Sequence, residues 1–134
     1  MATTTSHPAA RRLGDEICDA IVQVLHDHTG RGPAQALAYV DEDLVTVLLL
    51  GTMTPADEGL ATCGEARFML DLRHKLQLTI ADDCIAHVER LTGRTVAALM
   101  SNSHLDPDVA LAAFVLSPVA ASPAPPASAR SRRR

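Results

Sequence analysis

Apolar residues recur every three or four positions in two long stretches of the chain, and two short apolar runs follow each stretch. The first stretch predicts an amphipathic helix of period 3.6 whose apolar side carries Leu13, Ile17, Ile21, Val24 and His28. Gly30 is placed to end this helix as the residue just beyond its C-cap.

The second periodic stretch opens with the signals of a helix start. Thr54 is a suitable N-cap, Pro55 fits the first helical position, and acidic residues follow in the first turn. An unbroken helix over 55–91 would be about 55 Å long, whereas a domain of this size is only about 35 Å across. We therefore expect this helix either to bend near Gly59 or Gly64 or to extend beyond its own domain.

Each helix is followed by a predicted β-hairpin. The apolar runs 34–40 and 44–50 flank the turn 41–43, and the runs 95–102 and 109–116 flank the turn 104–108. The tripeptide Thr-Gly-Arg closes both helices, at 29–31 and 92–94. The pattern predicts an α+β fold of duplicated helix-hairpin units (αββαββ), with a four-stranded, mostly antiparallel sheet and the helices on one face.

The organisation predicted from this pattern is one domain over residues 13–117. The first 12 residues carry no apolar periodicity, and residues 118–134 form a tail of proline, alanine and arginine that holds four of the eight prolines. Neither segment has enough apolar side chains to offset the entropy of ordering, so we expect both ends to be disordered.

The predicted strands are apolar on both sides, which is unusual for a sheet covered by helices on one face. Four strands of about six residues present roughly 380 Å² per face, close to the largest apolar patch that a monomer usually tolerates. We therefore expect a homodimer whose interface includes Leu48, Leu50, Leu111 and Val115. In the alternative arrangement, both hairpins form the centre of a sandwich that the helices close.

Charge and composition narrow the classes of function. All 16 acidic residues but only six of the 12 basic ones fall between residues 13 and 117, so this body carries a net charge of −10 and should repel nucleic acid and anionic membranes. No apolar run is long enough for a signal peptide or a membrane span, so we expect a cytoplasmic protein without direct membrane insertion. The odd count of three cysteines argues against a disulfide framework.

Candidate chemistry is sparse. His104, Asp106 and Asp108 share one turn and could hold a divalent ion, although aspartates in turns more often cap their own backbone. Arg31 and Arg94 occupy equivalent places in the two units and could bind an anion at a pseudo-symmetric site, or could instead bond the last carbonyls of their helices. No nucleotide-binding or nucleophile motif occurs, so we expect neither an enzyme nor a cofactor.

Several segments together resemble the MpsC-like family. They are Ile21-Val-Gln-Val-Leu, Thr29-Gly-Arg-Gly-Pro33, Asp41-Glu-Asp-Leu-Val45, and the stretch from Leu91-Thr-Gly-Arg94 through Ser101-Asn-Ser-His-Leu-Asp-Pro-Asp108 to Phe114-Val-Leu116. The resemblance covers roughly residues 13–117 and implies a small bacterial cytoplasmic protein associated with a sodium-translocating, membrane-potential-generating system. Two features depart from the family pattern: the alanines at 110, 112 and 113, and the arginine-rich tail.

The resemblance carries no catalytic residues. It favours a non-enzymatic accessory or regulatory protein that acts through protein-protein contact and is a candidate subunit of a membrane transport complex. The alternative hypothesis is a small anion or divalent-ion sensor that uses Arg31, Arg94 or the turn from His104 to Asp108.

Overall fold

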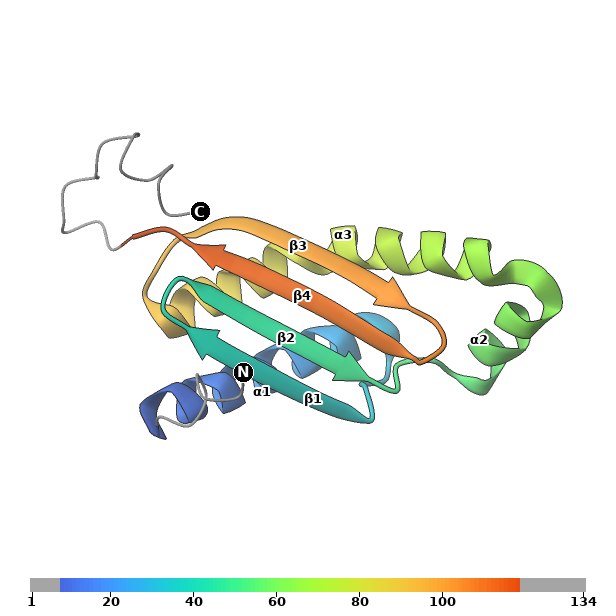
Figure 1. Ribbon diagram of the computed structural model, residues 1–134, viewed down its shortest axis with the longest axis horizontal. Coiled ribbons are helices and arrows are strands. Elements are labelled where there is room, and N and C mark those ends of the chain that lie inside the picture. The colour runs from blue at the N-terminus through green and yellow to red at the C-terminus, as the bar shows by residue number, and fades with distance from the viewer. Residues whose placement is uncertain (1–7, 119–134) are drawn as a thin grey trace.

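The computed structural model describes residues 8–118, which form helices and one β-sheet in the predicted order (Figure 1). The elements are α1 (Pro8–Thr29), β1 (Gln35–Asp41), β2 (Leu44–Leu50), α2 (Pro55–Leu60), a π-helical segment η2 (Ala61–Glu65), α3 (Ala66–Thr92), β3 (Val96–His104) and β4 (Val109–Leu116). The α+β prediction is therefore confirmed, and α2, η2 and α3 together cover the predicted second helical stretch.

The four strands form one antiparallel sheet in the order β1-β2-β4-β3. Each hairpin supplies one edge strand and one central strand, so that β2 of the first hairpin pairs with β4 of the second. Helices α1 and α3 both lie behind this sheet (Figure 1). The alternative in which helices close a sandwich around the hairpins is wrong, because both helices pack against the same face.

Helix α1 starts earlier than the sequence pattern indicated. It begins at Pro8 and not at Leu13, so residues 8–12, which we expected to be disordered, are helical. Ile17, Ile21 and Val24 of the predicted apolar stripe are buried and Leu13 is partly buried, but His28 at its end is exposed. Gly14 permits close packing on the sheet, because a Cβ there would lie 3.2 Å from the carbonyl oxygen of Ala38 in β1. Residues 1–7 and the predicted tail after residue 118 lie outside the described residues.

The second helical stretch bends where a glycine allows it. Thr54 and Asp57 form a capping box at the start of α2, and the chain leaves helical geometry at Cys63 and Gly64, where Gly64 has φ +88°. The predicted bend near Gly64 is confirmed. The 27 residues of α3 still span about 40 Å, against about 30 Å for the nine residues of β3. The start of α3 therefore extends past the end of the sheet (Figure 1).

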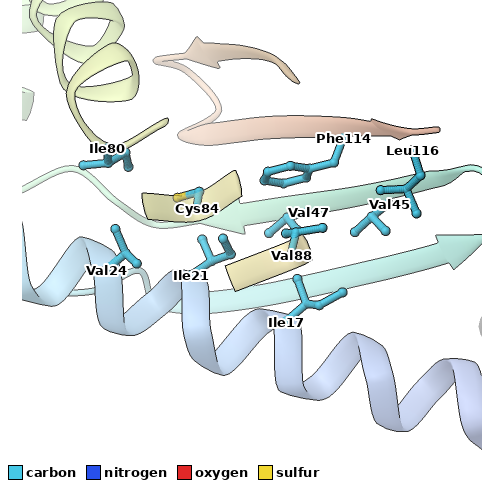
Figure 2. Packing of buried hydrophobic residues seen from close by; sticks show 10 residues of the cluster. All are labelled: Ile17, Ile21, Val24, Val45, Val47, Ile80, Cys84, Val88, Phe114 and Leu116. Carbon is cyan, nitrogen blue, oxygen red and sulfur yellow. The ribbon is translucent and has the colours of Figure 1, made fainter. Parts of the chain in front are cut away.

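The hydrophobic core fills the space between the two long helices and the inner face of the sheet (Figure 2). Its buried members come from α1, α3 and the two central strands: Ile17, Ile21, Val24, Val45, Val47, Ile80, Cys84, Val88, Phe114 and Leu116. Among the described residues, no charged or polar side chain is buried in this core. The stabilisation of the fold therefore depends mainly on apolar burial.

None of the helices within residues 8–118 combines the length and the apolar character that crossing a bilayer requires.

Candidate functional site

The outer face of the sheet, on the side away from the helices, is left uncovered by the described residues. Strand alternation and the pairing register place every second residue of each strand on this side. We call this surface the open face; it consists of Gln35, Leu37, Tyr39, Asp41, Leu44, Thr46, Leu48, Leu50, Ala98, Met100, Asn102, His104, Val109, Leu111, Ala113 and Val115. Its centre is apolar, and its polar residues lie mainly on the edge strands.

The four interface residues predicted from the sequence all belong to the open face. Leu48 and Leu50 lie on β2, and Leu111 and Val115 lie on the neighbouring strand β4. Leu111 is 43% exposed, and Met100 on the edge strand β3 is 59% exposed. The structure thus brings these residues onto one surface, and their role in an interface stays a prediction.

Arg94 has a structural position at one end of the sheet. Its guanidinium donates to the carbonyl oxygens of Glu42 and Ser117 and to the carboxylate of Asp43, the last at 2.6 Å. These bonds join the turn between β1 and β2 to the end of β4. Arg94 therefore has its donors satisfied by the protein, and the partners are not the last carbonyls of its helix.

Arg94→Ala is expected to destabilise the fold by about 2–3 kcal/mol, because charge-assisted hydrogen bonds are removed and two carbonyl groups lose a donor. Urea denaturation followed by circular dichroism measures the change. Arg31→Ala is the matched control, since Arg31 follows a helix-ending glycine in the same way, and its effect should stay within about 0.5 kcal/mol. Equal losses of stability for the two variants would contradict the role of Arg94 in joining the turn between β1 and β2 to the end of β4.

Arg31 lies at the opposite end of the sheet from Arg94. It precedes the start of β1, whereas Arg94 contacts the turn that follows the end of β1, and the seven residues of β1 span about 23 Å. Within residues 8–118 the Arg31 side chain makes no hydrogen bond or ion pair, and its backbone N–H donates to the Thr29 hydroxyl oxygen at 3.3 Å. The predicted pseudo-symmetric anion site that would use both arginines together is therefore not formed.

The turn between β3 and β4 does not assemble the predicted metal ligands. The Asp108 carboxylate accepts hydrogen bonds from the Thr52 hydroxyl at 3.0 Å and from the Met53 amide at 2.7 Å, and thereby holds the chain after β2. His104 Nδ1 donates to the carbonyl oxygen of Pro107 at 2.9 Å. Over the range 8–118, no three His, Cys, Asp or Glu side chains, and so not His104, Asp106 and Asp108, form a group that could hold a metal ion.

The three cysteines occupy different environments. Cys84 is buried on the apolar side of α3, and its burial, with the nearby Asp83 charge as a smaller cause, raises the pKa of its thiol to about 11. Cys18 is half-buried, and its pKa is also raised, mainly by burial. Cys63 is exposed at the bend before α3.

An apolar groove between α1, α3 and the inner face of the sheet was not predicted from the sequence. It encloses about 300 Å³, with Ile21 and Ile80 among its wall residues and Ser101, Ala110 and Ala112 in its floor. A signal was present in the alanines of β4, which depart from the pattern of the family that the sequence resembles. Their small side chains leave space between the sheet and the helices.

Comparison with known proteins agrees with the segments that first indicated a family. Residues 10–118 match the family model described as "Na+-translocating membrane potential-generating system (MpsC)". No curated protein and no solved structure gives a significant match. The matched range contains all the strands and nearly all of the helical residues described above. The resemblance seen in the sequence is confirmed, and the chain belongs to the MpsC family.

Proposed function

We propose that this protein is a non-enzymatic, cytoplasmic accessory or regulatory component of a sodium-translocating, membrane-potential-generating system, and that it acts as a homodimer through protein-protein contact. Membership of the MpsC family supports the association with that system. The open face supports the proposed protein-protein contact. The single observation that carries the proposal is this apolar sheet surface, which no described element of the chain covers.

The area of the open face suits a dimer. Strands of 7, 7, 9 and 8 residues present about 490 Å² of projected area, more than the sequence alone indicated. Two copies would bury about twice that area, and side chains that stand out from the sheet have more accessible surface than their projection. A pair of open faces therefore approaches the standard range of about 1,200–2,000 Å² for stable interfaces.

The charge pattern of the open face favours a protein partner. Asp41 is the only acidic side chain on it and lies at the end of the edge strand β1, while Leu48 and Leu111 lie opposite each other at its centre. Depletion of charge at the centre is typical of the core of a protein interface. A surface that is apolar at its centre can also pair with itself about a two-fold axis, as most soluble homodimers do.

The internal repeat belongs to the same proposal. Each half of the chain contributes a long helix and a hairpin, and β2 and β4 occupy equivalent central places in the sheet. A duplicated helix-hairpin unit would account for this arrangement.

The molar mass in solution tests the dimer directly. Light scattering at low micromolar concentration should give twice the 14.2 kDa of one chain. A mass of one chain at concentrations up to 100-fold higher would contradict the proposal.

The association with the transport system needs a cellular measurement. Deletion of the gene should lower the sodium-dependent membrane potential reported by a voltage-sensitive dye, and the unmodified chain should restore it. A variant that carries a charge at the centre of the open face, Leu111→Glu, should fail to restore it. Equal restoration by both proteins would show that the open face is not the surface that functions.

A further inference from the structure

The groove between α1 and α3 has a floor of small side chains. Ser101 of β3 pairs with Ala112 of β4, and both line the groove together with Ala110. Larger side chains at these positions would fill the space, as Phe114 does further along β4, where it is 1% exposed. A space of about 300 Å³ within the apolar layer of a protein interior exceeds an ordinary packing defect and falls at the lower end of ligand-pocket volumes.

One end of the groove is polar and carries two arginines. Arg31, Thr52, Asp57 and Arg73 line it, and Ala34, three residues after Arg31, donates its amide to the carbonyl oxygens of Leu50 and Gly51 just before Thr52. Arg73 is held by the Thr52 hydroxyl and by Asp57, at 3.5 Å. The Asp108 carboxylate also lies at this end, where it accepts from the Thr52 hydroxyl, so the two arginines are matched by two carboxylates. Both carboxylates are held by other partners, Asp57 by Arg73 and Asp108 by Thr52 and Met53, and among residues 8–118 the Arg31 guanidinium makes no ion pair.

We propose that this groove binds a free, single-chain amphipathic monocarboxylate, with the hydrocarbon chain between α1, α3 and the floor of β3 and β4 and the carboxylate against Arg31. The proposal goes beyond the function proposed above, because it involves the inner face of the sheet and not the open face. The apolar walls of the groove suit a hydrocarbon chain, and the Arg31 guanidinium, which makes no ion pair within residues 8–118, suits one carboxylate.

The volume of the groove limits the length of the hydrocarbon chain that it can hold. An engineered apolar cavity of about 150 Å³ accommodates benzene, so a space twice as large holds about ten to twelve carbons. Decanoate is therefore a suitable probe. Two compounds serve as comparison probes. Acetate has the carboxylate without the long hydrocarbon chain, and decyltrimethylammonium has the same hydrocarbon chain with a cationic head.

Isothermal titration calorimetry with the full chain, below the micelle concentration of each probe, tests the assignment. Decanoate should bind one site per chain, decyltrimethylammonium should bind at least fivefold more weakly, and acetate should give no heat. Arg31→Ala should weaken decanoate binding about five- to tenfold, as expected for one partly exposed ion pair, and should not weaken the binding of decyltrimethylammonium. Arg67→Ala, which removes an exposed arginine of α3 outside the groove, should change neither.

A filling substitution locates the site. Ser101→Leu places an apolar side chain in the floor of the groove and should abolish decanoate binding while the unfolding midpoint of the free protein is retained. If this variant does not fold, Ala112→Val provides the same test with a smaller side chain. Undiminished decanoate binding to a folded filled variant, or equal affinity for the anionic and cationic probes, would overturn the proposal.

Discussion

Leu111→Glu is expected to convert the homodimer into a monomer. Leu111 lies at the centre of the open face, opposite Leu48 of β2, and it is 43% exposed in the single chain. In a two-fold dimer the substitution would bury one unpaired carboxylate from each copy, at a cost of at least about 3 kcal/mol per copy. Association should therefore weaken by about 10⁴-fold, as measured by the concentration dependence of molar mass.

Two variants control for the general effect of the new charge. Leu78→Glu introduces the same charge on α3, at a residue that is 64% exposed and lies outside the open face, and it should leave the dimer intact. Leu111→Met keeps the centre of the open face apolar and should also remain dimeric. If the dimer persists in Leu111→Glu, the two copies do not meet through this face.

Phe114→Ala is expected to lower the free energy of unfolding by about 3–5 kcal/mol, a large share of the stability of a domain of this size. Phe114 is 1% exposed and contributes to the core from the central strand β4, where Val45 is its neighbour on β2 (Figure 2). The substitution removes apolar burial and leaves a cavity beside α3. Urea denaturation monitored by circular dichroism gives the change.

The second phenylalanine of the chain provides the matched control. Phe68 lies near the start of α3 and is 50% exposed, so Phe68→Ala should cost about 1 kcal/mol or less. Losses of similar size for the two variants would contradict the position of Phe114 in the core.

Most of the fold could be predicted from local patterns. The helical period gave α1, the capping signals at Thr54 and Pro55 gave the start of α2, and Gly64 gave the bend. The strand order and the placement of both helices on one face depend on contacts between residues far apart in the chain. Apolarity on both sides of the strands was compatible with either a covered or an open outer face.

The candidate sites were harder to predict. Equivalent sequence positions suggested that Arg31 and Arg94 act together, but they are at opposite ends of β1, and Arg94 is held by the turn between β1 and β2. The aspartates of the second turn looked like ligands, but Asp108 reaches across to the chain after β2. The groove forms where small side chains of β3 and β4 face two helices. It could not be predicted from any one segment, because it depends on how distant segments pack together.

The pairing of β2 with β4 has a consequence for the route by which the chain folds. Each hairpin closes locally, as His104 and Val109 do across the second turn, and such hairpins form within microseconds. The pairing of β2 with β4 joins Leu44 to Val115 and Leu50 to Val109, and α2, η2 and α3 all lie between these two strands in the sequence. The β2–β4 pairing can form only when this long loop closes. The rate-limiting step of folding is therefore expected to be the docking of the second helix and hairpin on the first.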